Sequence, residues 1–142
     1  MSAVHHLLHS DLTGQIIGAY FEVYNELGAG FRESVYERAL ANQLEALDFK
    51  VDRQPEISVR YREQTVGIFR GDLLVNEVVL LELKARDALE SSHETQLLNC
   101  LRATSIEVGL LLNFGPKPQF KRLIYTNDRK GPRIAPKRTD QP

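Results

Sequence analysis

The spacing of apolar residues along this chain of 142 residues changes from helical to alternating and back. Between residues 13 and 27, apolar side chains recur at intervals of three and four, which predicts a helix with one buried face. The segment Gly28-Ala29-Gly30 should end that helix, because glycine readily adopts the left-handed conformation found at helix C-termini. The same spacing returns over residues 33–47 and predicts a second helix.

An alternating pattern then predicts β-strands. Residues 49–53 and 57–62 alternate apolar with polar side chains, and Pro55 separates them. Residues 65–75 predict one long strand. Residues 78–85 are apolar on both faces at the start, which is typical of a strand in the centre of a sheet.

The helical pattern reappears after residue 90. A helix is predicted from Ser91 to about residue 103, with Ser91 and Glu94 as its capping box. Residues 107–114 predict another buried strand and residues 120–125 an edge strand. This order of elements predicts an α/β fold, a mixed β-sheet flanked by helices.

Length and composition fit one globular domain, with 42% hydrophobic and 26% charged residues. We assign residues 1–12 to an N-terminal extension, 13–126 to a single domain and 127–142 to a basic, flexible tail. From Arg129 onward the net charge is +4, so the remainder carries −5 and does not attract nucleic acid as a whole. One cysteine excludes an internal disulfide, and no apolar run is long enough for a membrane helix, so we expect a cytoplasmic protein without a membrane partner.

Two charges interrupt the predicted central strand. Glu82 and Lys84 lie two residues apart, so their side chains share one face of the sheet. A lone buried charge is unfavourable. The two groups can form a structural ion pair, lie at a solvent-open strand end, or hold a metal ion and a water. Asp72, on the preceding strand, is an acid in the same setting.

The length of the turn between these strands determines whether the two acids meet. A two-residue turn pairs Asp72 with Leu81, so that Asp72 misses the face of Glu82. A three-residue turn, or a one-residue bulge at Gly71, pairs Asp72 with Glu82 instead. We predict one of these two geometries if the acids form a site. Two carboxylates suit Mg²⁺, and a lysine beside them can orient water or stabilise charge on a phosphate.

Three stretches together resemble a known family. Residues 30–36 read GFRESVY, which fits the Gly-x-x-Glu-x-x-Tyr signature of the GxxExxY proteins, and GDLLVNEVVLLELKA and HETQLLNCL continue the match. This family resembles the PD-(D/E)XK nuclease superfamily. The resemblance implies a restriction-endonuclease-like core and hydrolysis of phosphodiester bonds with Mg²⁺ or Mn²⁺. By position, it implies that Asp72, Glu82 and Lys84 are catalytic and that the two acids hold the metal.

The resemblance extends to two further residues. Glu33 matches the glutamate of the signature and is implied as a metal ligand, although an acid at a helix start is also stabilised by the helix dipole. Gln96 resembles the catalytic glutamine of the Gln-x-x-x-Tyr motif in the RecB-like branch, which orients substrate or lysine. Cys100 stands where that motif has tyrosine.

Three residues are candidates for contact with substrate. Tyr36 can support Glu33 or simply pack, and we favour packing. His93 shares a helix face with Gln96, yet an exposed residue in the first turn is the simpler interpretation. Arg86 belongs to a set of basic residues that can form a local basic rim.

Two functions of different classes follow from these patterns. The first is a metal-dependent nuclease with nucleic acid, DNA or RNA, as its partner. The second is a non-catalytic binding module that retains the nuclease fold. No helix-turn-helix or zinc finger is present in the sequence, so a homodimer or a larger complex is compatible with either function.

Overall fold

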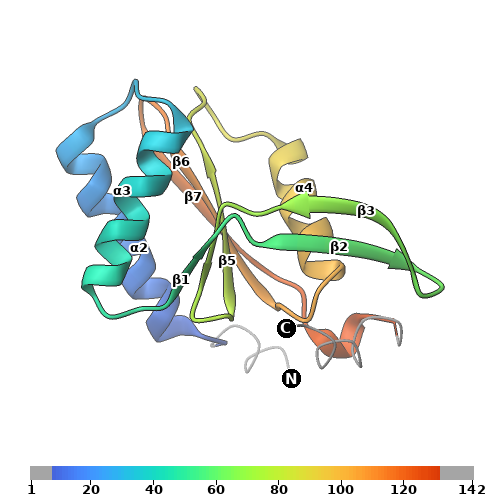
Figure 1. Ribbon diagram of the computed structural model, residues 1–142. Coiled ribbons are helices and arrows are strands. Elements are labelled where there is room, and N and C mark those ends of the chain that lie inside the picture. Colours follow the sequence, from blue (N-terminus) through green and yellow to red (C-terminus); the bar gives the residue numbers. More distant parts are fainter. Residues whose placement is uncertain (1–7, 132–142) are drawn as a thin grey trace.

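The computed structural model describes residues 8–131 of the chain (Figure 1). The expected N-terminal extension and basic tail therefore fall largely outside the described residues. The elements follow one another in this order: α2 (Ser10–Leu27), α3 (Glu33–Ala46), β1 (Val51–Arg53), β2 (Glu56–Tyr61), β3 (Gln64–Arg70), β4 (Leu73–Val75), β5 (Val79–Lys84), α4 (Ser91–Arg102), β6 (Val108–Phe114), β7 (Pro118–Ile124) and the 3₁₀ turn η1 (Asn127–Arg129).

A five-stranded sheet in the order β1-β4-β5-β6-β7 forms the centre of the fold. The β5–β6 pair is parallel and the other neighbours are antiparallel, so the sheet is mixed. Helices α2 and α3 cover one face and α4 covers the other (Figure 1). The predicted α/β fold is confirmed, including the central position of β5 and the edge position of β7.

The two faces of β5 are packed against different helices. Leu81 and Leu83 belong to the core formed with α2 and α3, whereas Leu80 belongs to the core formed with α4. Because side chains alternate along a strand, Glu82 and Lys84 follow Leu80 on the α4 face. The site predicted from sequence therefore lies on the side of the sheet that α4 covers.

The prediction of one long strand over residues 65–75 is wrong. The chain forms β3, breaks at Gly71-Asp72, and continues as β4 in a different sheet. A Cβ on Gly71 would lie 2.7 Å from Cδ1 of Leu80, so a larger residue at this position would displace the buried Leu80 side chain. The β2–β3 hairpin consequently forms a separate two-stranded sheet that extends across α4 (Figure 1).

The loop between α2 and α3 is held by a buried tyrosine. Tyr36 is fully buried, and its ring stacks on Phe114 with centroids 4.2 Å apart. Its hydroxyl donates to the Gly28 carbonyl at 2.5 Å and accepts the N–H of Phe31 at 3.1 Å. Gly30 in this loop has a φ of 113°, which favours glycine. These contacts fix where α3 begins.

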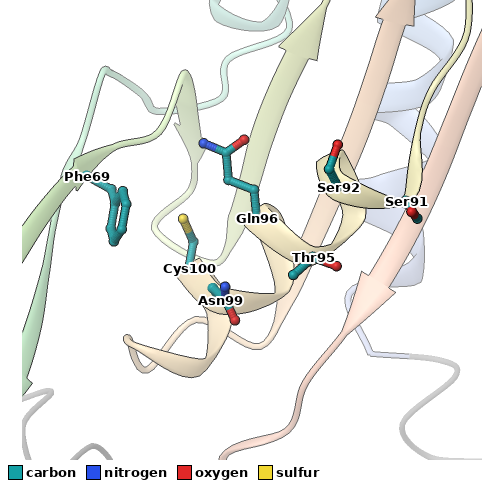
Figure 2. A pocket seen from close by; sticks show the side chains of 7 residues that line it. All are labelled: Phe69, Ser91, Ser92, Thr95, Gln96, Asn99 and Cys100. Atoms are coloured by element: carbon teal, nitrogen blue, oxygen red, sulfur yellow. The ribbon is translucent and has the colours of Figure 1, made fainter.

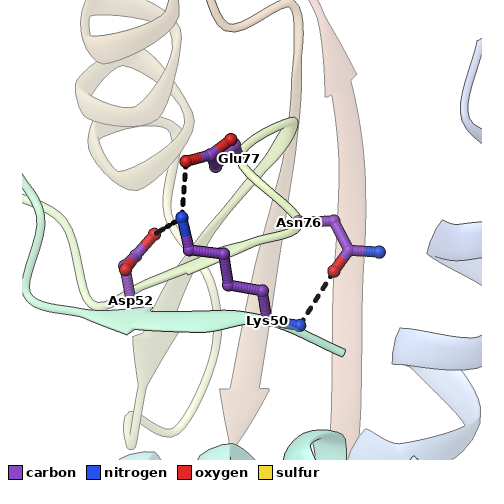
Figure 3. A network of polar contacts seen from close by, with 4 residues as sticks. All are labelled: Lys50, Asp52, Asn76 and Glu77. Carbon is purple, nitrogen blue, oxygen red and sulfur yellow. Dashed lines mark hydrogen bonds and ion pairs between the residues drawn. The ribbon is translucent and has the colours of Figure 1, made fainter. Parts of the chain in front are cut away.

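The β4–β5 turn lies at the end of the sheet opposite the α2–α3 loop (Figure 1), and polar contacts with Lys50 hold it in place (Figure 3). Asn76 and Glu77 both have left-handed backbone conformations, and Asn76 Oδ1 accepts the N–H of Lys50 at 2.9 Å. The Lys50 ammonium contacts Glu77 at 2.5 Å and Asp52 at 4.0 Å. Exposed ion pairs contribute little individually. The backbone bond to Asn76 therefore does most to tie the turn to the chain leading into β1.

Within the described residues, no helix has both the length and the apolar character needed to cross a bilayer.

Candidate active site

The β4–β5 register brings two carboxylates together. Val75 pairs with Val79, so the turn contains three residues, and the same register places Asp72 beside Glu82. This is one of the two geometries predicted from sequence; Gly71 marks the break between sheets rather than a bulge in this hairpin. The N–H of Leu83 donates to Asp72 Oδ2 at 2.6 Å.

Burial shifts the pKa of both acids upward. Glu82 is 7% exposed, and burial, the charge of Asp72 and a hydrogen bond between the two side chains raise its pKa to about 8. Burial also raises the pKa of Asp72 to about 6, although the N–H of Leu83 opposes this. Because each acid raises the cost of ionising the other, the pair favours retention of a proton near neutral pH.

Lys84 lies two residues beyond Glu82, is half-buried and shares its face. Its positive charge lowers the pKa of Asp72 and of Glu82 against the effect of burial. No salt bridge among the described residues includes Glu82 or Lys84. A tight structural ion pair is therefore not the reason for these two charges.

The start of α3 supplies two more acids. Glu33, placed by the Tyr36 loop, accepts the N–H of Ala85 at 3.2 Å, and its charge raises the pKa of Asp72 and of Glu82. Glu37, one helical turn further on, raises the pKa of Asp72 more strongly than Glu33 does. Sequence reasoning missed Glu37. Its spacing of four residues from Glu33 on one helix face was the available signal.

On the α4 side of the sheet, a cavity of about 420 Å³ lies between Phe69 of β3 and the residues of α4 (Figure 2). Gln96 and Cys100 both line it. Burial and the charge of Glu82 raise the pKa of Cys100 to about 11, so the thiol at the cavity wall lies within electrostatic reach of Glu82. The structure thus brings Gln96 to the same side of the sheet as the acids.

His93 is buried rather than exposed as expected. It is 7% exposed, and its Nδ1 accepts the N–H of Glu90 at 3.0 Å. The helix cap is therefore Glu90 with His93 at the third helical position, not the predicted pair of Ser91 and Glu94. The ring atom that accepts this bond is already engaged within the protein.

The last two candidates differ in accessibility. Arg86 is exposed, and its backbone is held by Asn113, which accepts the Arg86 N–H at 3.0 Å and donates to the Arg86 carbonyl at 2.9 Å. Tyr36 does not reach the surface, because its ring and hydroxyl are used in packing the loop before α3. Asn113, fully buried, is a positioning residue that the sequence pattern did not reveal.

Asp72 and Glu82 offer the oxygen ligands that a divalent cation such as Mg²⁺ prefers. Among residues 8–131, no group of three or more His, Cys, Asp or Glu side chains is arranged to hold a metal ion. Mg²⁺ is usually bound through one or two carboxylates, with waters and substrate phosphates completing its shell. The oxygen donors of Asp72 and Glu82 fit that requirement, because a cation between them would offset their mutual repulsion.

A mixed sheet flanked by helices, with two acids and a lysine on one face, is the architecture of a PD-(D/E)XK nuclease-like fold. A family model described as PD-(D/E)XK nuclease superfamily matches residues 10–123, and the chain belongs to this superfamily.

A solved structure titled "Crystal structure of SSO0001" matches with a TM-score of 0.46 and 15% sequence identity, over 66% of this chain and 50% of that one. The present chain thus spans about half the length of that protein. The comparison with curated proteins gives no significant match.

Proposed function

We propose that this protein is a divalent-metal-dependent nuclease that hydrolyses phosphodiester bonds in nucleic acid. The observation that carries the proposal is the adjacent register of Asp72 and Glu82, with Lys84 on the same face of the central strand. Rigid strands hold ligands more precisely than loops do. Membership of the superfamily supports the same class of chemistry.

Asp72 and Glu82 would hold Mg²⁺ or Mn²⁺, and Glu33 would approach from α3. A bound divalent cation polarises a phosphoryl oxygen and lowers the pKa of a bound water. The upward shifts in the pKa of both acids support this role, since two buried carboxylates that repel each other are stabilised by a cation.

The remaining roles belong to side chains around the acids. Lys84 would stabilise negative charge on the phosphate or orient the attacking water. Gln96, at the wall of the cavity, would orient substrate, and Arg86 would contact the phosphate backbone. We also propose that the chain is one of the GxxExxY proteins, because residues 30–36 carry that signature. Each signature residue has a local role that supports the proposal: Gly30 has a positive φ, Tyr36 packs the loop, and Glu33 accepts the N–H of Ala85.

The test is a cleavage assay on single-stranded DNA, duplex DNA and RNA with Mg²⁺ or Mn²⁺. We expect metal-dependent cleavage by the wild type and its loss in Lys84→Ala. The matched control is Lys50→Ala, because Lys50 lies by the β4–β5 turn at the opposite end of β5. Equal cleavage by wild type and Lys84→Ala would refute the role of the lysine, and no cleavage of any substrate would refute the nuclease.

A non-catalytic binding module is the second candidate. It is favoured by the bond from the Leu83 N–H to Asp72 Oδ2, which already engages one carboxylate oxygen. This candidate predicts nucleic-acid or protein binding without cleavage and without measurable affinity for Mg²⁺.

A further inference from the structure

The cavity beside α4 has one aromatic wall. Phe69 of β3 faces Cys100 across it, with polar side chains of α4 alongside (Figure 2). Phe69 is 45% exposed, which is unusual for a phenylalanine that neighbours a hydrophobic core. The polar lining consists of Ser91, Ser92, Thr95, Gln96 and Asn99, and no charged side chain contributes to it.

The hairpin register explains why this ring points toward α4. Phe69 pairs with Ile57, so the two side chains share one face of the hairpin. Ile57 is 2% exposed and packs in the core that contains Leu97 and Leu101 of α4. Ile68, on the opposite face, is 57% exposed to solvent. The ring of Phe69 is thus held over the cavity by a packed neighbour.

The cavity lies close to the acids of the candidate active site, although neither Asp72 nor Glu82 lines it. A Cβ on Gly71 would lie 3.4 Å from Glu82 Oε2, and Gly71 follows Phe69 by two residues, or about 7 Å of extended chain. On the helix side, Cys100 lines the cavity and is influenced by the charge of Glu82. A group held under Phe69 therefore lies next to the place where a scissile phosphate would bind.

The chemistry of the lining favours a planar, uncharged, heteroaromatic ligand. A phenylalanine ring offers a stacking surface, and stacking on an aromatic side chain tolerates any of the bases. The carboxamides of Gln96 and Asn99 each provide a donor and an acceptor for the edge of such a ring. A volume of about 420 Å³ lies at the lower end of the range of about 300–1,000 Å³ for ligand pockets, which suits one base with part of its sugar.

We infer that this cavity binds one unstacked nucleobase, so the preferred substrate is single-stranded nucleic acid or an unpaired segment. A base inside a duplex is paired and stacked, and it would have to be extruded to reach Phe69. The negative charge of the body, −5 without the tail, also disfavours a duplex more than a single strand, because the duplex carries about twice the phosphate charge per unit length. The inference rests on the proposed function for the identity of the ligand, while binding itself needs neither metal nor cleavage.

The test is fluorescence anisotropy in EDTA with the full chain, a labelled 12-nucleotide single strand as DNA and as RNA, and the matching DNA duplex. Phe69→Ala should weaken single-strand binding by about 5- to 150-fold, the range expected for loss of one stacked base. Phe69→Trp should restore most of the affinity, because it restores a stacking surface. Ile68→Ala is the matched control, since it truncates the neighbouring exposed side chain on the other face and should leave affinity unchanged.

A second readout reports on the base directly. A single 2-aminopurine in the oligonucleotide should lose fluorescence on binding to wild type, because it stacks on Phe69, and should not do so with Phe69→Ala. Equal single-strand affinity of wild type, Phe69→Ala and Ile68→Ala would overturn the inference. So would equal losses of single-strand and duplex affinity, or no single-strand binding by wild type.

The two proposals fail in distinguishable ways. Phe69-dependent binding in EDTA without cleavage in Mg²⁺ would support the base site and refute the nuclease. Cleavage that depends on Lys84 while Phe69→Ala binds normally would support the nuclease and refute the base site.

Discussion

Replacing Glu82 by glutamine should stabilise the metal-free protein at alkaline pH. The substitution keeps the shape of the side chain but removes a group that must ionise while buried. Burial and Asp72 raise the pKa of Glu82 from 4.5 to about 8 in the folded protein. The Glu82 carboxyl therefore contributes most to the free energy of unfolding below about pH 4.5. That contribution is lost as the pH rises through 8, because the carboxyl ionises at a lower pH in the unfolded chain than in the folded protein.

The size of the effect follows from the shift. At about 1.4 kcal/mol for each pKa unit, moving from 4.5 to about 8 corresponds to a loss on the order of 4–5 kcal/mol once Glu82 is fully ionised. Glu82→Gln avoids this loss. We expect the variant to exceed the free energy of unfolding of the wild type by less than about 1 kcal/mol near pH 5 and by several kcal/mol at pH 9.

The measurement is urea denaturation followed by far-UV circular dichroism, at pH 5 and pH 9 in EDTA. Glu26→Gln, a substitution on the exposed side of α2, is the control and should not change the pH dependence. Mg²⁺ at pH 9 should stabilise the wild type but not Glu82→Gln, by about 2.7 kcal/mol at one hundred times the dissociation constant. A variant no more stable than wild type at pH 9 would refute the buried, proton-retaining pair.

Two other substitutions separate the site from the fold. Asp72→Asn should abolish Mg²⁺ binding in calorimetry with unchanged circular dichroism, because the amide oxygen can still accept the N–H of Leu83; undiminished affinity would remove Asp72 from the metal site. Gly71→Ala should destabilise by about 1–3 kcal/mol, because its Cβ would meet the buried Leu80 at 2.7 Å. Gly14→Ala, with nothing within 4 Å, should instead be neutral or stabilising in the same denaturation assay.

Helix and sheet positions that depend on burial were predictable from sequence. The spacing of apolar residues identified α2 and α3, and the apolar character of both faces of β5 identified the central strand. These features are local consequences of which side chains must leave water. Helix α2 begins at Ser10, three residues before the predicted start, which reflects the usual uncertainty at helix ends.

Features that depend on contacts between distant segments were not predictable. The chain over residues 65–75 has a continuous strand pattern, but it changes partners at Gly71, because β3 pairs with β2 whereas β4 pairs with β1 and β5. His93 is a capping residue because its ring accepts the Glu90 N–H. The sequence pattern favours Ser91 and Glu94 as the cap instead. The placement of Phe69 over α4 follows from a hairpin that packs outside the main sheet.

The sequence indicated which residues form the candidate site, but not how they are arranged. Asp72, Glu82 and Lys84 stood out because charges interrupt apolar strands, but the alternatives of a two-residue and a three-residue turn required the structure. Glu37 was missed because a glutamate on a helix surface is common. Only the structure shows that Glu37 lies close enough to Asp72 to raise the pKa of that acid.

The β4–β5 turn would give this fold a simple evolutionary route between the two proposed functions. Loss of a single codon within residues 76–78 would leave a two-residue turn and move Asp72 opposite Leu81, on the other face from Glu82. Strand β4 has only three residues, and the shift would also require the buried Leu73 and Val75 to repack. A lineage could therefore lose the paired acids in one step while keeping its helices and central strand. Within a family of such proteins, turn length would then separate enzymes from inherited scaffolds more reliably than overall sequence similarity.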